Sequence, residues 1–486
     1  MNAAAPGQFG KIALRGGILT GLSQAIRIAI QFLSVVILAR LLMPEDFGLV
    51  ASVTPIVAFV GLFQNLGLQQ AVIQRRDISQ RQLNQVFWVS AAVGLCCTAI
   101  VAALSPAIAL FYDDPRMTGI ALASGAPLFL FSFAALPLAL MNRRLQFGQL
   151  ALNDVMAALG GLVATIAAAY AGLGYWSLVI GPAVSAIVTL AAAWRTARWT
   201  PGKPELRIDR EILSFGANLT GFNLVNFFAR NLDTLLIAKF SGATQLGYYD
   251  RAYKLMLFPL QNITQPLSRL MIPILSRIQD DKKRFRDIYM ETNWLLAGVT
   301  APGIAALTMT AGEVVSVLFG ERWLPVAAIF AWLGIASLTQ PISATSGWIF
   351  ICQGRTRTMF RWGVYSSITT VAAFAIGIQW GAVGVAAAYA ISGYALRIPV
   401  LAALLHRVGP ITAWDFLMPQ LLFVVSALAA WACYLALPHS WVSWNLSAIA
   451  IAVGLNYGLA LLLMLAVPTP RRALVAAWNR VRTATR

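Results

Sequence analysis

Polar side chains recur at helical spacing on three otherwise apolar stretches of the sequence. In the first stretch, Gln24, Arg27 and Gln31 share one face of a predicted helix. The other two stretches carry similar faces, formed by Asn223, Asn226, Arg230 and Asp233, and by Gln265 and Arg269. Polar faces on three apolar helices predict a shared hydrated cavity, and these faces are the candidate binding site.

A charge in the middle of a membrane span needs either a partner or a function. Arginine there costs roughly 2.5–3.5 kcal/mol on insertion scales, and Arg27 lies about ten residues into its apolar stretch. Arg27 therefore either packs against a carbonyl or an acid, or binds a ligand, whereas Arg269 is close enough to a helix end to extend out of the membrane. Arg230 and Asp233 are three residues apart, so they can form an ion pair, either structural or within a coupling-ion site. Asp154 lies near the start of another apolar stretch and is a candidate for the same roles.

The sequence contains no catalytic or cofactor-binding motif. A glycine-rich phosphate loop with lysine, zinc-ligand spacing and a nucleophile elbow are all missing. The four cysteines lie in or beside apolar runs without CxxC spacing, which argues against a metal site or a disulfide framework. We expect no cofactor, no metal and no enzymatic activity.

The composition is that of an integral membrane protein. Of its 486 residues, 59% are hydrophobic and only 11% are charged, and the mean hydropathy is +0.72, whereas about a quarter of the residues of a soluble protein are charged. The net charge is +18, but the basic residues fall in alternate loops between apolar runs, without a basic face interleaved with aromatics. This distribution indicates topology signals and contacts with anionic membrane lipid, and we expect no nucleic-acid binding.

Fourteen apolar windows are long enough to cross a bilayer as helices. They lie near residues 17–42, 47–67, 83–111, 118–140, 152–171, 173–194, 212–238, 247–275, 294–319, 324–350, 360–379, 381–405, 415–437 and 441–466. We predict an all-α membrane protein with a six-helix bundle in residues 1–200, a second in 201–410, and two further helices with a basic tail in 411–486. Because the loops that would be cytoplasmic hold most of the lysine and arginine, both termini are predicted to be cytoplasmic.

An internal repeat relates the two predicted bundles. Residues 37–48, ILARLLMPEDFG, correspond to residues 236–247, LIAKFSGATQLG, so that Gly247 follows its counterpart Gly48 by 199 residues. At the same offset Gln24 corresponds to Asn223 and Arg27 to Asn226. Each repeat has an even number of helices, so the halves should be parallel, with a site at their interface.

The segments at 37–51 and 230–279 resemble bacterial polysaccharide exporters of the colanic acid and O-antigen flippase kind. These exporters belong to the multidrug, oligosaccharidyl-lipid and polysaccharide exporter superfamily. The resemblance implies a V-shaped pair of six-helix bundles in the bacterial inner membrane. It also implies alternating access and an undecaprenyl-pyrophosphate-linked oligosaccharide as substrate, with polysaccharide assembly proteins as possible partners. Arg27 and Arg269 are the nearest matches to the arginines with which lipid-flipping relatives hold the pyrophosphate, and arginine can bind phosphate through two parallel hydrogen bonds.

Two other functions remain open from the sequence. A multidrug antiporter of the same superfamily would favour acidic cavity residues for its cationic substrates, whereas the predicted cavity has more arginines than acids. A membrane-embedded glycosyl-transfer enzyme would need acids or bases on a sizeable aqueous loop, and the predicted outside loops are short.

Overall fold

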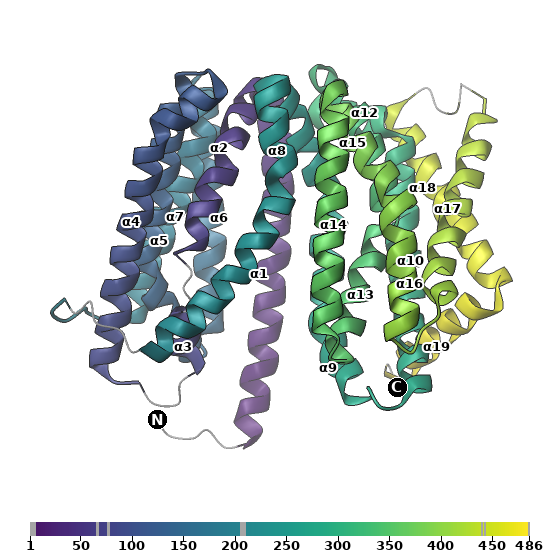
Figure 1. Cartoon of the computed structure of the whole chain (residues 1–486), viewed down its shortest axis with the longest axis horizontal. Helices are drawn as coiled ribbons and strands as arrows, with labels where there is room; N and C mark the ends of the chain where they lie inside the picture. The colour runs from purple at the N-terminus through teal and green to yellow at the C-terminus, as the bar shows by residue number, and fades with distance from the viewer. Residues whose placement is uncertain are drawn as a thin grey trace. The chain divides into compact units, whose positions relative to one another are not determined.

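The computed structural model describes residues 6–64, 68–74, 78–204, 210–438, 441 and 444–484. Every regular element in these ranges is a helix, and the chain divides into two compact units, Met1–Gly247 and Tyr248–Arg486 (Figure 1). The predicted all-α class is therefore confirmed. The predicted division after residue 200 follows the sequence repeat rather than compactness, and it stays a prediction.

The first unit contains seven helices and the opening part of an eighth. They are α1 (Pro6–Leu41), α2 (Pro44–Leu62), α3 (Leu68–Gln74), α4 (Gln80–Tyr112), α5 (Arg116–Arg143), α6 (Phe147–Tyr170), α7 (Trp176–Ala197) and the start of α8 (Arg210–Pro259). Ser79 and Gln82 start α4 with a reciprocal cap: the Ser79 hydroxyl accepts from the Gln82 amide, and the Gln82 side chain accepts from the Ser79 amide. Helices α1 and α6 pack against each other, which brings two of the candidate site residues together.

The second unit holds the end of α8 and the remaining helices. The longer ones are α9 (Gln265–Arg277), α10 (Lys282–Met309), α12 (Pro325–Ser337), α13 (Gln340–Cys352), α14 (Thr356–Gly377), α15 (Gly381–Ser392), α16 (Ile398–Val408), α17 (Ala413–Leu435), α18 (Asn445–Ala466) and α19 (Pro468–Ala484). The shorter ones are α11 (Ala311–Phe319), the 3-10 turns η2 (Glu321–Trp323) and η3 (Ile378–Trp380), and the π-helical turns η1 (Leu260–Thr264) and η4 (Gly393–Arg397). Helices α17 and α18 pack against α10, so the two C-terminal spans belong to this unit.

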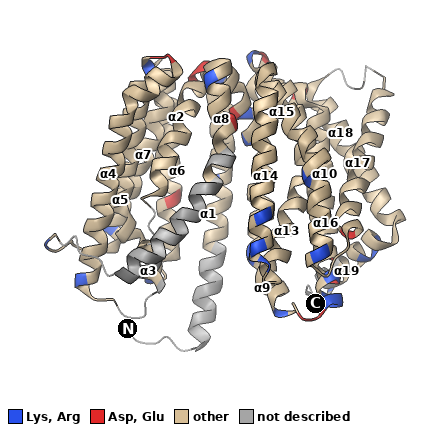
Figure 2. Cartoon of the chain, in the orientation of Figure 1, with Lys and Arg blue, Asp and Glu red and all other residues tan. Residues whose placement is uncertain are grey.

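The described helices agree with the predicted spans. Ten of them are long and apolar enough to cross a membrane, or eleven if α10 and α11, which meet at a bend of 83°, form one span. Each of the fourteen predicted windows coincides with a helical segment. The count of ten or eleven described spans is lower than the predicted fourteen partly because α14, α15 and α16 are counted as one stretch of 53 residues. Within that stretch, Gly381, with φ of +66°, separates α14 from α15. Most Lys, Arg, Asp and Glu residues lie toward the helix ends (Figure 2).

The internal repeat has a structural signature at the first break in each half. Met43, between α1 and α2, has an extended backbone with φ of −84° and ψ of 154°. Gly242 interrupts α8 with φ of 83° and ψ of 171°, a conformation that glycine adopts without strain. Gly242 follows Met43 by the repeat offset of 199 residues. Thus α8 is two helices joined at a break, as α1 and α2 are.

Candidate substrate site

The Arg27 guanidinium on α1 faces an acid on α6. Its Nη1 donates to the Asp154 carboxylate, with 3.2 Å between Nη1 and Oδ2, and about half of each side chain is exposed, 47% and 48%. Arg27 therefore has an acid partner, and ligand binding by this residue stays a prediction. A guanidinium has five N–H donors, and this bond uses one. Arg27 therefore keeps donors for a second anion.

The other polar residues of the α1 face lie beside this pair in sequence and are exposed. Gln24 and Gln31 are one helical turn before and after Arg27, and neither is buried. Ser23, on the neighbouring face, is buried and donates to the backbone carbonyl of Thr20. Helix α1 thus presents an amide, a guanidinium and a second amide along one open stripe.

Arg269 lies on α9 in the second unit and is exposed. Within the described part of the chain it has no hydrogen bond and no ion pair. Contacts with α13 hold α9 beside these residues: Trp348 Nε1 donates to the Ser268 hydroxyl over 2.9 Å, and the Cys352 thiol lies against the Ile272 carbonyl. Gln265 and Arg269, four residues apart and so neighbours on the helix surface, are both exposed.

The candidate residues of α8 are described only in part. The side chains of Asn223, Asn226 and Arg230 lie outside the described residues, so the predicted pair of Arg230 with Asp233 remains a prediction. Asp233 is buried, and its carboxylate accepts from the backbone amide of Thr234 over 2.8 Å.

Arg397 is a further cation within a predicted span, and the sequence did not assign it to the binding site. It ends η4, where its guanidinium donates to Thr370, to the Tyr389 carbonyl and to Ser392. The guanidinium also lies 4.2 Å from the centre of the Tyr389 ring. Neutral acceptors and an aromatic face therefore hold this charge without an acid, which indicates a structural role. Its position in a span was a signal, but the sequence did not reveal its partners.

Charged residues of the first unit also meet at the connections of α1 with α2 and of α4 with α5. Arg116 bonds both Asp114 and Glu45, with Nη2 2.8 and 2.7 Å from their oxygens, and these hydrogen bonds hold the pKa of Asp114 below its usual value. Lys239 of α8 donates to Asp113 over 2.9 Å. These contacts connect α2 with the start of α5, and α8 with the end of α4. We assign them a structural role rather than a role in binding substrate.

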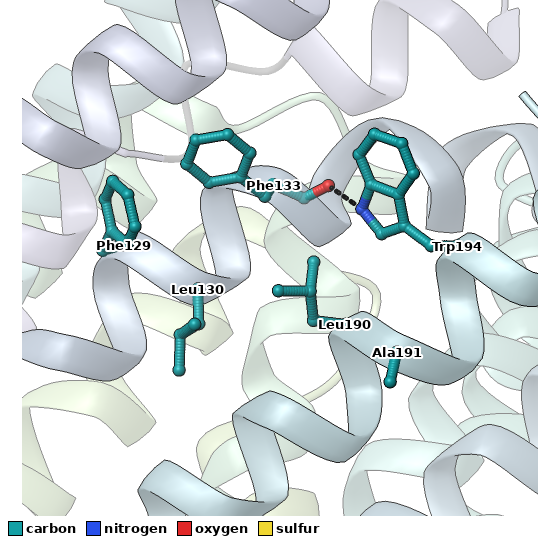
Figure 3. Close-up of a pocket in the computed structure, with 6 residues that line it drawn as sticks. All are labelled: Phe129, Leu130, Phe133, Leu190, Ala191 and Trp194. Atoms are coloured by element: carbon teal, nitrogen blue, oxygen red, sulfur yellow. Dashed lines mark hydrogen bonds between the residues drawn. The ribbon is translucent and has the colours of Figure 1, made fainter. Parts of the chain in front are cut away.

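An apolar hollow lies between α5 and α7 of the first unit (Figure 3). Its walls are Phe129, Leu130, Phe133, Leu190, Ala191 and Trp194. The one polar group at its wall, the Trp194 N–H, already donates to the Phe133 carbonyl over 3.1 Å. The hollow therefore has no free side-chain donor for a phosphate, and the polar stripe of α1 is the better candidate for a pyrophosphate group. Among the described residues no group of acidic, histidine or cysteine side chains could hold a metal ion.

Comparisons with known proteins show that the chain is similar to proteins of polysaccharide biosynthesis. The lipopolysaccharide biosynthesis protein WzxC of Escherichia coli (strain K12) is 25% identical over 388 residues, which cover 76% of each chain. The succinoglycan biosynthesis transport protein ExoT of Rhizobium meliloti (strain 1021) is 26% identical over 371 residues, which cover 73% of this chain and 72% of ExoT.

Solved structures show the same fold. The lipid II flippase MurJ in an inward closed conformation superposes with a TM-score of 0.68 at 14% identity, covering 91% of this chain and 98% of MurJ. An inward-facing multidrug resistance MATE family transporter of the MOP superfamily gives a TM-score of 0.58 at 13% identity, covering 78% of this chain and 95% of the transporter. A family model described as polysaccharide biosynthesis protein matches residues 37–328, more than half of the 486 residues. The chain therefore belongs to this polysaccharide biosynthesis protein family.

Proposed function

We propose that this protein flips an undecaprenyl-pyrophosphate-linked oligosaccharide across the bacterial inner membrane by alternating access. The observation that carries the proposal is the half-exposed pair of Arg27 and Asp154 within a membrane span. An ion pair in contact with lipid tails is costly, so a half-exposed pair at this depth favours a water-filled path. The relatives support the substrate class: ExoT is named a transport protein of succinoglycan biosynthesis, and MurJ a lipid II flippase.

Arg27 and Arg269 are the residues that we propose bind the pyrophosphate. Both are cations on exposed polar faces, and an arginine can present two parallel N–H groups to a phosphate. Gln24, Gln31 and Gln265 would bind neighbouring oxygens, and Asn223 and Asn226 would do so from α8. The function requires no bond chemistry from the protein, which acts as a transporter rather than an enzyme.

The same pair argues against a multidrug antiporter with a cationic substrate. Asp154 is the acid next to Arg27, and its carboxylate is already bonded to this arginine. A cationic drug would have to displace the arginine, whereas an anionic headgroup can bind the remaining N–H groups. We therefore rank the antiporter below the flippase.

Transport by purified protein in vesicles tests the proposal. A fluorescent lipid-linked oligosaccharide placed in both leaflets should become fully accessible to an external quencher or hydrolase only when the flippase is active. Vesicles with the Arg27→Glu, Arg269→Glu variant provide the matched control. Accessibility with wild-type protein no greater than in vesicles without protein would refute the function, whereas full accessibility with the variant would refute only the role of the two arginines.

Orientation is tested separately by cysteine labelling in intact cells. We expect residues 195–210 and the C-terminal tail to be cytoplasmic and residues 241–247 to be periplasmic, because the loops rich in lysine and arginine should be inside. An impermeant maleimide should therefore label a cysteine at 241–247 in intact cells, but one in residues 195–210 only after lysis. Labelling at 241–247 only after lysis would contradict this topology.

A further inference from the structure

Two glycines bring the start of α2 into backbone contact with α8 in the first unit. A Cβ atom on Gly48 would lie 1.6 Å from the Ala243 carbonyl oxygen, and one on Gly247 would lie 1.9 Å from the Pro44 carbonyl oxygen. Real Cβ atoms essentially never approach closer than 3.0 Å. The obstructing atoms are backbone, which cannot swing aside as a side chain can. The two helices can therefore meet this closely only with glycine at both positions.

The two close approaches involve equivalent residues of the two repeats: Gly48 meets Ala243, and Gly247 meets Pro44. Ala243 follows Pro44 by 199 residues, and Gly247 follows Gly48 by the same number. Each helix begins directly after the break of its own repeat, at Met43 and at Gly242. A reciprocal contact between equivalent residues is what a two-fold relation between the repeats would give. The first turns of two equivalent helices thus meet at this junction.

The junction is buried, whereas the ion pair beside it is not. Gly48, Leu246 and Gly247 are buried. By contrast, the side chains of Lys239 and Asp113 are 32% and 82% exposed. Exposed ion pairs contribute little to stability. The glycine packing rather than the ion pair therefore controls how closely the second repeat approaches the first here.

We propose that Gly48 and Gly247 are positioning residues for transport, and that their reciprocal contact is the closed form of a gate that opens during the cycle. Parallel repeats that alternate access must change their contact with each other. Because backbone atoms rather than interdigitated side chains form this contact, the two helices can separate without side-chain rearrangement. This proposal rests on the proposed function in one respect: the gate is taken to open and close for the transported lipid-linked oligosaccharide.

Cysteine accessibility tests the gate without any substrate. Ser52 is a suitable reporter because it lies one turn after Gly48 and is 1% exposed, and cysteine is nearly its size. The Ser52→Cys protein should carry alanine in place of the four native cysteines. We expect Gly48→Ala and Gly247→Ala each to raise the maleimide labelling rate several-fold and to lower transport by a similar factor. Gly363→Ala in α14 is the matched control, because nothing lies within 4 Å of its added Cβ.

The comparison with the control decides the proposal. Labelling and transport equal to those of Gly363→Ala in both variants would overturn the gate. If wild-type protein moves no lipid-linked oligosaccharide but the glycine variants still label faster, the proposed function fails and the gate stands.

A crosslink tests the same gate where the glycine variants do not fold. Cysteines replacing Lys239 and Asp113 should react with a bifunctional maleimide that contains a cleavable disulfide, since these side chains now meet. The crosslinked protein should lose transport and recover it on reduction, while each single cysteine variant treated in the same way should keep it. Full transport in the crosslinked state would overturn the proposal.

Discussion

Arg27 in the first unit and Arg269 in the second are both cations, but their surroundings differ. Arg27 is bonded to Asp154, whereas Arg269 has no ion pair or hydrogen bond within the described residues. A pair has little net charge, so Arg27 attracts an anion weakly from a distance and binds it by using its remaining N–H groups. Arg269 keeps its full charge and attracts an anion without first giving up a partner. The comparison teaches that two arginines on polar faces need not have interchangeable roles.

Reversing both charges should have the largest effect. The Arg27→Glu, Arg269→Glu variant places acids against the phosphate, and each lost charge-assisted hydrogen bond costs about 1.5–3 kcal/mol. We expect transport in vesicles to fall at least about 100-fold, since about 1.4 kcal/mol corresponds to a factor of ten. Arg322→Glu, in η2, is the control for charge reversal elsewhere. Normal surface polysaccharide from the double variant at wild-type abundance would contradict the proposed role of both arginines.

Neutral replacements should separate the two arginines. Arg27→Ala leaves the Asp154 carboxylate unpaired beside the phosphate, so we expect a loss of about 100-fold, against about 10-fold for Arg269→Ala. Adding Asp154→Asn should recover more of the loss in Arg27→Ala than in Arg269→Ala. In the first variant it removes an unpaired acid beside the phosphate, whereas in the second it only frees Arg27. Transport rates of six proteins measure this coupling: wild type, the three single variants Arg27→Ala, Arg269→Ala and Asp154→Asn, and the two double variants. Equal recovery of transport in the Arg27→Ala and Arg269→Ala backgrounds would show that Asp154 is not coupled specifically to Arg27.

Lysine replacements should have a moderate effect. Lysine keeps the charge but loses the planar fork that binds two phosphate oxygens. We expect Arg27→Lys and Arg269→Lys each to retain partial transport, lowered by roughly 3- to 5-fold and less than in the matching alanine variant, because the ammonium keeps the charge and can still donate to a phosphate oxygen. Headgroup affinity and transport rate, measured on the same preparations, should fall together. A lysine variant as inactive as the alanine variant would mean that geometry, and not charge, is what the site needs.

Removing the acid alone should have the smallest effect. Asp154→Asn frees Arg27, so it should tighten binding of the anionic headgroup by a few-fold, as expected for a half-exposed ion pair worth about 1 kcal/mol or less. Titration with a soluble pyrophosphate analogue would measure the change. Weaker binding in Asp154→Asn would show that the acid orients Arg27 for the phosphate instead of competing with it.

Helix positions were predictable because apolar length is a local property of the sequence. Each window that predicted a span coincides with a helix, and the matched glycines at 48 and 247 correctly identified the repeat. Helix α19 was missed, since residues 468–484 were counted as a basic tail. Its buried Ala473 packs against the core of the second unit, a contact that a hydropathy window does not detect.

The sequence identified candidate residues for the site, which remain a prediction, but not the partners of those residues. Arg27 and Asp154 were both candidates, yet they are 127 residues apart, and the helical period of one segment says nothing about which helix it packs against. The same limit applies to Arg397, whose acceptors come partly from α14. For Gly48 and Gly247 the repeat gave equivalence but not contact, because equivalent residues meet only where the symmetry axis passes close to them.

The direction in which Arg269 points depends on the number of residues in the π-helical turn η1, which lies immediately before α9. A π turn holds one residue more than an α turn, and each residue of an α-helix rotates the chain by about 100°. Deleting one residue within 260–264 would restore an α turn and rotate Arg269 by about that angle relative to the preceding helix, unless the contacts of α9 with α13 hold it in place. A single-residue insertion or deletion in this segment would thus turn the charge of Arg269 without replacing any side chain.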